Sequence, residues 1–224
     1  MTIKHWPITE RPREKLLNHG VASLSDAELL AIFLQSGTVG RSAVDVAREA
    51  LGHFGNLSKL LCSDKQSFCA FNGFGVARYT LLQAAMEVSR RHMLESIQNT
   101  DVLSSPQDVR DYLSLNLTGL PHEVFSALFL DNRHRVIAYQ ELFRGTIDSA
   151  AVYPREVVKL CLSCNAAAVI FAHNHPSGVA EPSDTDVRLT KKLIDALALV
   201  DVRVLDHLIV GQGVQTSLAE RGLM

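Results

Sequence analysis

The spacing of hydrophobic positions along this 224-residue chain changes near residue 95. Up to Leu94, apolar residues recur at helical spacing in segments separated by glycines and short polar turns. These segments predict helices over 12–19, 26–35, 42–54, 57–62 and 77–94. The pattern therefore indicates a small all-α domain covering residues 1–94.

After this domain comes a polar, turn-rich stretch at 95–101, which we interpret as a linker. From residue 102 to 224 strands alternate with helices, which is typical of an α/β domain around one mixed sheet. The expected helices cover 106–115, 154–163 and 183–199, and the expected strands cover 126–131, 136–143, 166–172, 202–210 and 215–219. The chain is thus predicted to form two domains.

Composition supports two buried cores, since 47% of the residues are hydrophobic and the mean hydropathy is +0.10. No apolar run approaches the roughly 20 residues that a membrane-spanning helix needs. Residues 1–11 also lack the apolar segment of a signal peptide. We therefore expect a cytoplasmic protein with no membrane association.

The strongest chemical signal follows the apolar segment 166–172, which is typical of a strand buried on both faces. His173 and His175 are two residues apart, so their side chains point the same way on an extended chain. A turn rich in Pro and Gly comes next, and Ser183 then begins an amphipathic helix that carries Asp186 in its first turn. Singly, these residues also suit a helix cap and a surface histidine. Together they match the three ligands and one open position of a catalytic zinc site.

The order His-x-His, seven residues, Ser, two residues, Asp resembles the signature of the JAMM metalloproteases, also called MPN or JAB1/MPN/Mov34 proteins. The wording at 173–178 and at 205–207 resembles the bacterial RadC branch, also called UPF0758, and segments 11–15 and 24–30 are similar to it as well. This resemblance implies an MPN/JAMM fold, which is a cytidine-deaminase-like mixed sheet with flanking helices. It also implies a zinc-dependent hydrolase that acts on a peptide or protein substrate.

The resemblance further implies roles for single residues. One Zn²⁺ per chain is expected on His173, His175 and Asp186, with a metal-activated water attacking a peptide or isopeptide carbonyl. Ser183 is implied to donate a hydrogen bond to the developing oxyanion, although the same hydroxyl could cap the helix. In JAMM proteins a glutamate far upstream acts as the general base.

Three glutamates precede the metal motif in the second domain. Glu123 lies just before the first expected strand, which resembles the family's position, and we therefore prefer it as the base. Glu141, inside an expected strand, is the second candidate, although it could simply face solvent. Glu156 suits a helix N-terminus, where a negative charge is favoured without any catalytic role.

Two further polar groups allow two interpretations each. Asp206 and His207, in the expected strand 202–210, are either partners that orient a metal ligand or ordinary polar residues of a strand. Cys161 and Cys164 form a Cys-x-x-Cys, but they lie at the end of an expected helix, where a thiol pKa is not lowered. With no second such pair in the sequence, we assign them no metal or redox role.

The first domain offers one hint of nucleic-acid binding. Gly73 and Gly75 lie in a turn before the expected helix 77–94, and this resembles a helix-hairpin-helix, whose backbone N–H groups approach a DNA phosphate. Asn72 and Phe74 depart from the usual Pro and Ile or Val of that motif. Residues 1–100 carry 11 Lys and Arg against 9 Asp and Glu, which is far less basic than a typical non-specific DNA binder. DNA contact is therefore expected to be weak.

Rival chemistries fit the sequence less well. An HNH nuclease spreads its three letters over a ββα unit, whereas here they are contiguous at 173–175. A zinc deaminase needs His-x-Glu with Pro-Cys-x-x-Cys, and a metallo-β-lactamase-type hydrolase needs His-x-His-x-Asp-His; neither string occurs in the sequence. The remaining alternative is a DNA-associated repair or replication module whose metal domain is a non-catalytic docking platform.

Overall fold

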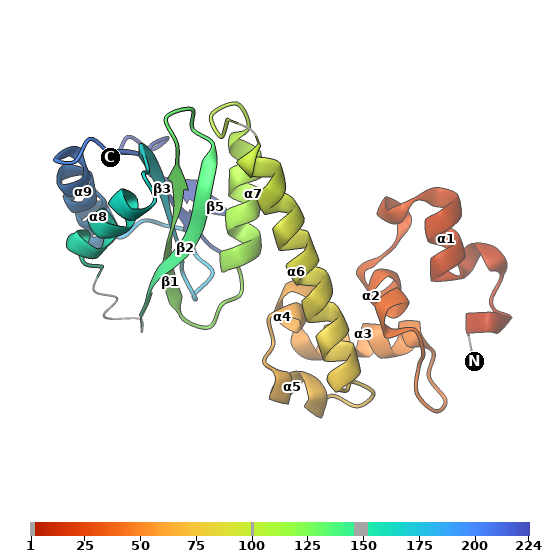
Figure 1. The fold of residues 1–224 in the computed structure, drawn as a ribbon. Helices are drawn as coiled ribbons and strands as arrows, with labels where there is room; N and C mark the ends of the chain where they lie inside the picture. The colour runs from red at the N-terminus through yellow and green to blue at the C-terminus, as the bar shows by residue number, and fades with distance from the viewer. Residues whose placement is uncertain (1–2, 100, 146–151) are drawn as a thin grey trace. The chain divides into compact units, whose positions relative to one another are not determined.

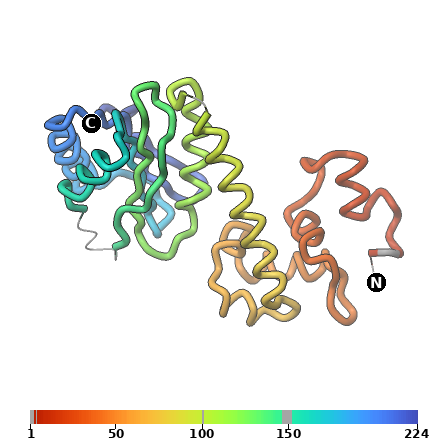
Figure 2. Tube along the Cα trace, in the orientation of Figure 1, coloured from red at the N-terminus to blue at the C-terminus, as the bar shows by residue number. Residues whose placement is uncertain are grey.

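A computed structural model describes residues 3–99, 101–145 and 152–224 of the chain. It divides into two compact units, Met1–Val88 and Ser89–Met224, which are treated separately below. Figure 1 shows their secondary structure and Figure 2 the course of the chain through each.

The first unit is helical, as the sequence predicts. It contains α1 (Pro12–His19), α2 (Asp26–Leu34), α3 (Ala43–Phe54), α4 (Leu57–Leu61), α5 (Lys65–Ala70), the start of α6 (Val76–Gln98) and three 3-10 turns, η1 (Ile3–His5), η2 (Ile8–Glu10) and η3 (Val21–Ser23). Capping boxes begin α2 at Ser25 and α3 at Ser42. Leu30, Leu60 and Phe68 lie in its buried core. Helix α5 was not among the predicted helices.

The glycine turn before α6 is closely packed. Gly73 has a positive φ of 92°, and a Cβ at this position would lie 2.7 Å from the Cγ2 atom of Thr38. The guanidinium of Arg78 donates hydrogen bonds to the carbonyl oxygens of Gly73 and Ser36. These contacts give the turn a structural reason for its glycine. DNA binding through Gly73 and Gly75, and the helix-hairpin-helix resemblance itself, stay predictions.

The second unit contains a five-stranded mixed sheet in the order β2-β1-β3-β4-β5. Its strands are β1 (Glu123–Leu130), β2 (Val136–Gly145), β3 (Ala168–Asn174), β4 (Arg203–Val210) and β5 (Gln215–Ser217), and its helices are α7 (Pro106–Leu117), α8 (Pro154–Ser163) and α9 (Asp184–Ala198). β1 runs antiparallel to β2 and β3, β3 runs parallel to β4, and β5 runs antiparallel to β4. The expected α/β fold is confirmed.

Helices cover both faces of this sheet (Figure 1). On one face, Val109 and Leu113 of α7 pack with Leu128 of β1. On the other face, α8 and α9 pack against Phe125 and Phe171. The C-terminal residues lie beside α9 (Figure 2) and join Val187 in a small apolar cluster. β3 is the central strand and is buried along its whole length.

The expected linker at 95–101 differs from the structure, because α6 continues to Gln98. The polar and turn-forming residues of this stretch suggested a loop. However, Ile97 is buried in the core of the second unit, and Met93 and Leu94 pack against the same core. Burial of these side chains favours helix over residues 95–98, the first part of the expected linker. No helix among the described residues is long and apolar enough to cross a membrane.

Candidate metal centre

The two histidines of the motif lie where β3 ends. His173 is inside β3, which ends at Asn174, and it is only 1% exposed, whereas the sequence predicted a strand end two residues earlier, at Ala172. It pairs with Phe125 of β1, and the two rings are stacked with centroids 6.2 Å apart. The backbone N–H of His175 then bonds to the carbonyl of Val210 on β4 at 3.0 Å. His173 is therefore held from both sides by β1 and β4, and His175 is held by β4.

The carboxylate comes from the first turn of α9. Ser183 is the N-cap residue and forms a capping box with Asp186, as its spacing predicts. The Ser183 N–H and hydroxyl donate to Oδ2 of Asp186 at 2.8 and 2.7 Å, and the Asp186 N–H donates to the Ser183 Oγ at 3.1 Å. The cap thus fixes the Asp186 carboxylate as well as the start of the helix.

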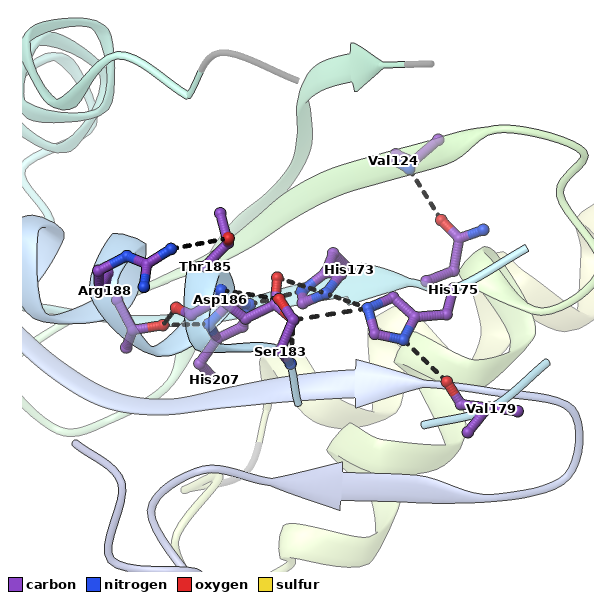
Figure 3. A network of polar contacts seen from close by, with 11 residues as sticks. Val124, His173, His175, Val179, Ser183, Thr185, Asp186, Arg188 and His207 are labelled. Carbon is purple, nitrogen blue, oxygen red and sulfur yellow. Dashed lines mark hydrogen bonds and ion pairs between the residues drawn. The ribbon is translucent and has the colours of Figure 1, made fainter. Parts of the chain in front are cut away.

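These three side chains converge as the sequence predicts (Figure 3). One ligand atom from each of His173, His175 and Asp186 lies within 4.8 Å of the other two. The two histidine Nε2 atoms are 3.0 Å apart, and Oδ1 of Asp186 is 3.4 Å from Nε2 of His173. Ligand atoms about 2.0–2.1 Å from a tetrahedral zinc ion are separated by about 3.3 Å. The spacing of this group therefore fits a metal ion.

A hydrogen bond determines which nitrogen His175 presents to the site. Its Nδ1 lies 2.8 Å from the carbonyl oxygen of Val179. A carbonyl oxygen only accepts, so Nδ1 carries the proton and the Nε2 of the neutral ring is unprotonated. The lone pair that faces the site is therefore available to a metal.

His173 is oriented by a longer chain of hydrogen bonds. The hydroxyl of Thr190 donates to the carbonyl of Asp186 at 2.6 Å, so its oxygen accepts from Nδ1 of His207, also at 2.6 Å. The Nε2 of His207 then accepts from Nδ1 of His173 at 2.8 Å. This order leaves Nε2 of His173 unprotonated as well. When both rings are neutral, their two Nε2 lone pairs face each other at 3.0 Å, an arrangement that a cation between them stabilises.

Burial and hydrogen bonds set the pKa values of the three side chains of this group. Burial lowers the pKa of His173 to about 4, so that ring is neutral at neutral pH. A hydrogen bond to Asp186 raises the pKa of His175. Burial opposes ionisation of Asp186, but its hydrogen bonds with His175 and Ser183 hold the pKa of its carboxyl well below the usual range. The carboxylate is therefore charged, and in the absence of metal a proton on His175 is its nearest counter-charge.

Glu123 is the glutamate that faces this group. It is the first residue of β1 and alternates with Val124, so its side chain lies on the same face of the sheet as Phe125 and His173. Burial raises the pKa of its carboxyl, the charge of Asp186 raises it further, and His175 acts in the opposite direction. Glu123 is thus near both side chains without being one of the three metal-ligating groups.

The other two glutamates lie elsewhere. Glu141 is opposite Ser126 on β2, which places its side chain on the α7 face of the sheet, where it pairs with Arg144. Glu156 is a half-buried residue of α8 that pairs with Lys159 at 3.2 Å. Among the three candidates, the geometry places Glu123 alone beside the metal ligands.

Asp206 and His207, the two neighbouring polar residues of β4, make different contacts. His207 contacts His173, one of the three side chains that could hold a metal ion, and this fits the first of the two interpretations. Asp206 instead accepts from the Ser217 hydroxyl at 2.7 Å and the Ala219 N–H at 3.1 Å, so it ties β4 to the segment around β5. The sequence did not identify Thr190. Its position four residues after Asp186, on the same face of α9, was the only available signal.

The Cys-x-x-Cys pair shows no sign of reactivity. Cys161 is fully buried, and burial raises the pKa of its thiol to about 12. Burial also raises the pKa of Cys164. A thiolate, the reactive and metal-binding form, is therefore disfavoured at both positions.

Comparison with known proteins agrees with this geometry. Residues 103–223 match the RadC-like JAB domain family, and residues 3–80 match the UPF0758 N-terminal family. The chain belongs to the UPF0758 family. A UPF0758 protein of Nitrosococcus oceani is 60% identical over 100% of both chains, and one of Cellvibrio japonicus is 61% identical over 99% of both. The group His173, His175 and Asp186 lies entirely within the RadC-like JAB domain.

The contact of His207 with His173 leads to a first prediction for this domain. A His207→Phe variant keeps an aromatic ring at this position but loses both nitrogen atoms, so we expect zinc affinity to fall by about 10- to 100-fold. A His207→Gln variant retains one acceptor and one donor and should recover part of that affinity. Competition with a chromophoric chelator measures both. Equal affinities in the Phe variant and the wild type would show that His207 does not orient the ligand.

Proposed function

We propose that this chain is a zinc-dependent peptidase of the JAMM type that hydrolyses a peptide or isopeptide bond. The observation that carries the proposal is the meeting of three metal-ligating atoms with a separate, partly buried glutamate, Glu123, on one face of the sheet. The ligand set of two histidines and one carboxylate leaves a fourth position open, as in catalytic rather than structural zinc sites.

Zinc held by His173, His175 and Asp186 would supply Lewis-acid polarisation of the substrate carbonyl and lower the pKa of a water to about 7. Glu123 accepts the proton of the attacking water and later returns it to the leaving amine. Its raised pKa suits both steps, because a base whose pKa is closer to the working pH both takes and releases a proton readily.

Two roles remain for Ser183. In the structure its Oγ accepts from the backbone N–H of Asp186, which is the capping role, and its hydroxyl donates to the Asp186 carboxylate. Stabilising an oxyanion requires the same hydroxyl to turn its proton toward the substrate. The residue lies on the exposed side of the group, so both arrangements are sterically open to it.

A Ser183→Ala variant distinguishes these roles when it is compared with Ser42→Ala. Ser42 forms the same type of capping box with Asp45 in α3, which belongs to the first unit of the chain. We expect each variant to lose about 0.5–2 kcal/mol of unfolding free energy. Only Ser183→Ala should also lose about 10²–10³ in kcat. Denaturant melts and steady-state kinetics are the measurements, and an unchanged kcat in Ser183→Ala would restrict this serine to the cap.

The proposal itself is tested on the purified full-length chain. We expect about one zinc ion per chain by elemental analysis. We also expect cleavage of members of a library of linear and isopeptide-linked peptides, abolished by a chelator and restored by zinc. Stoichiometric zinc without any cleavage, together with DNA affinity that survives metal removal, would favour the DNA-associated binding module instead.

A further inference from the structure

The two ladders of β3 end at different residues. Pairing of β3 with β1 stops at His173 and Phe125, whereas pairing with β4 continues to Asn174 and Val210. β3 therefore turns away from β1 just where β1 presents Glu123. A backbone ladder no longer holds the start of β1 against the metal-ligating strand.

The side chain of Asn174 bridges this gap. Its Oδ1 accepts from the backbone N–H of Val124 at 2.8 Å, a bond drawn at Val124 in Figure 3, and its Nδ2 donates to the carbonyl of His122 at 3.0 Å. His122 and Val124 are the two residues that flank Glu123. The side-chain amide of Asn174, a residue only 2% exposed, thus forms hydrogen bonds with the backbone on both sides of the proposed base.

We infer that Asn174 is a positioning residue that sets the place of Glu123 relative to the metal ligands. The inference rests on the proposed function, in which Glu123 is the general base. His173 and His175 flank Asn174, so a single tripeptide contains two proposed metal ligands and the side chain that holds the backbone around the base. A displacement of about 1 Å at such a base costs on the order of 10²-fold in rate.

These two hydrogen bonds require an amide side chain. Asparagine has one acceptor oxygen and two donor N–H groups at the end of a short side chain. The N–H of Val124 uses the oxygen of Asn174, and the carbonyl of His122 uses one of its N–H groups. Aspartate has nearly the same shape, but as an anion it only accepts. It would keep the bond from Val124 and place an oxygen against the carbonyl of His122.

The test compares Asn174→Ala and Asn174→Asp with Ser126→Ala in the full-length, zinc-loaded protein. Ser126 is a matched control because its buried hydroxyl donates to the carbonyl of Ala172 at 3.0 Å, which also joins β1 to β3 but farther from Glu123. The first readout is amide hydrogen exchange. We expect exchange at Val124 to rise about tenfold in Asn174→Ala, as loss of about one hydrogen bond predicts, and to stay unchanged in Ser126→Ala.

The second readout locates the base without using turnover. With Co²⁺ in place of zinc, the paramagnetic shift of the Glu123 amide depends on its position relative to the metal. We expect this shift to change in both Asn174 variants and to stay constant in Ser126→Ala. Zinc affinity should remain within about threefold of the wild type, because the ligands themselves are intact.

The third readout is kinetic, for a substrate found with the peptide library. We expect kcat to fall by about 10²-fold in both Asn174 variants, with KM unchanged. An unchanged shift of the Glu123 amide, or zinc lost in parallel with activity, would overturn the inference. A wild type that binds zinc but cleaves nothing would refute the peptidase proposal, while the paramagnetic shift would still decide whether Asn174 positions Glu123.

Discussion

Replacing Glu123 by glutamine is expected to reduce hydrolysis by about 10²- to 10⁴-fold while one zinc ion per chain stays bound. Glutamine has nearly the same shape as glutamate but cannot accept and return the proton of the attacking water. Because Glu123 lies outside the metal-ligating group, its replacement leaves the three ligands in place. Steady-state kinetics and elemental analysis on the same preparation measure the two effects.

Glu141→Gln is the matched control for this prediction. It makes the same chemical change on β2, but on the opposite face of the sheet, where Glu141 pairs with Arg144. We expect it to leave kcat unchanged. A loss of activity in Glu141→Gln together with full activity in Glu123→Gln would show that Glu123 is not the base.

The pH dependence of wild-type kcat/KM provides a second check on Glu123. The base works only when deprotonated, and burial raises its pKa above the usual value. Activity is therefore expected to decline as the pH falls through this raised pKa, and the acidic limb should be absent from the residual rate of Glu123→Gln. An identical acidic limb in that variant would point to another group.

The His173→Ala variant should lose its bound metal. We expect the zinc content to fall from about one ion per chain to near zero, because two remaining ligands cannot hold zinc tightly. The wild type should also gain about 2.7 kcal/mol of stability at a free zinc concentration of 100 times its Kd, and the variant should gain none. Elemental analysis and denaturant melts with and without zinc measure these effects.

His92→Ala is the control, because it shows whether replacing a histidine outside the metal-ligating group also lowers the zinc content. His92 is an exposed residue of α6, outside the metal-ligating group. It should keep the full zinc content and the full gain in stability. If His173→Ala bound as much zinc as His92→Ala, or if the wild type folded fully and bound none, the metal centre described above would be wrong.

Much of the metal site was predictable because it is local. His173, His175, Ser183 and Asp186 lie within a strand end, one turn and one capped helix, and each of these elements has a signature in the sequence. Local periodicity likewise predicted most helices and strands. It did not predict that α6 continues to Gln98, because packing of Ile97 in the core of the second unit overrides the polar composition there.

Glu123 marks the limit of that local reasoning. The second domain contains three glutamates upstream of the motif, and the choice among them relied on resemblance to a family. The antiparallel pairing of β1 with β3 gives a physical reason, since it places Glu123 on the face of His173 and leaves Glu141 on the other face.

The sequence alone thus determined the fold class, the family resemblance and the ligand-type residues, because these follow from short-range spacing. The tertiary structure decided how they work together. The contacts of Asn174 with residues 122 and 124, and of His207 with His173 and Thr190, join segments that are far apart in the chain. Such contacts depend on strand order and register, which the whole folded sheet sets and no single stretch of sequence specifies.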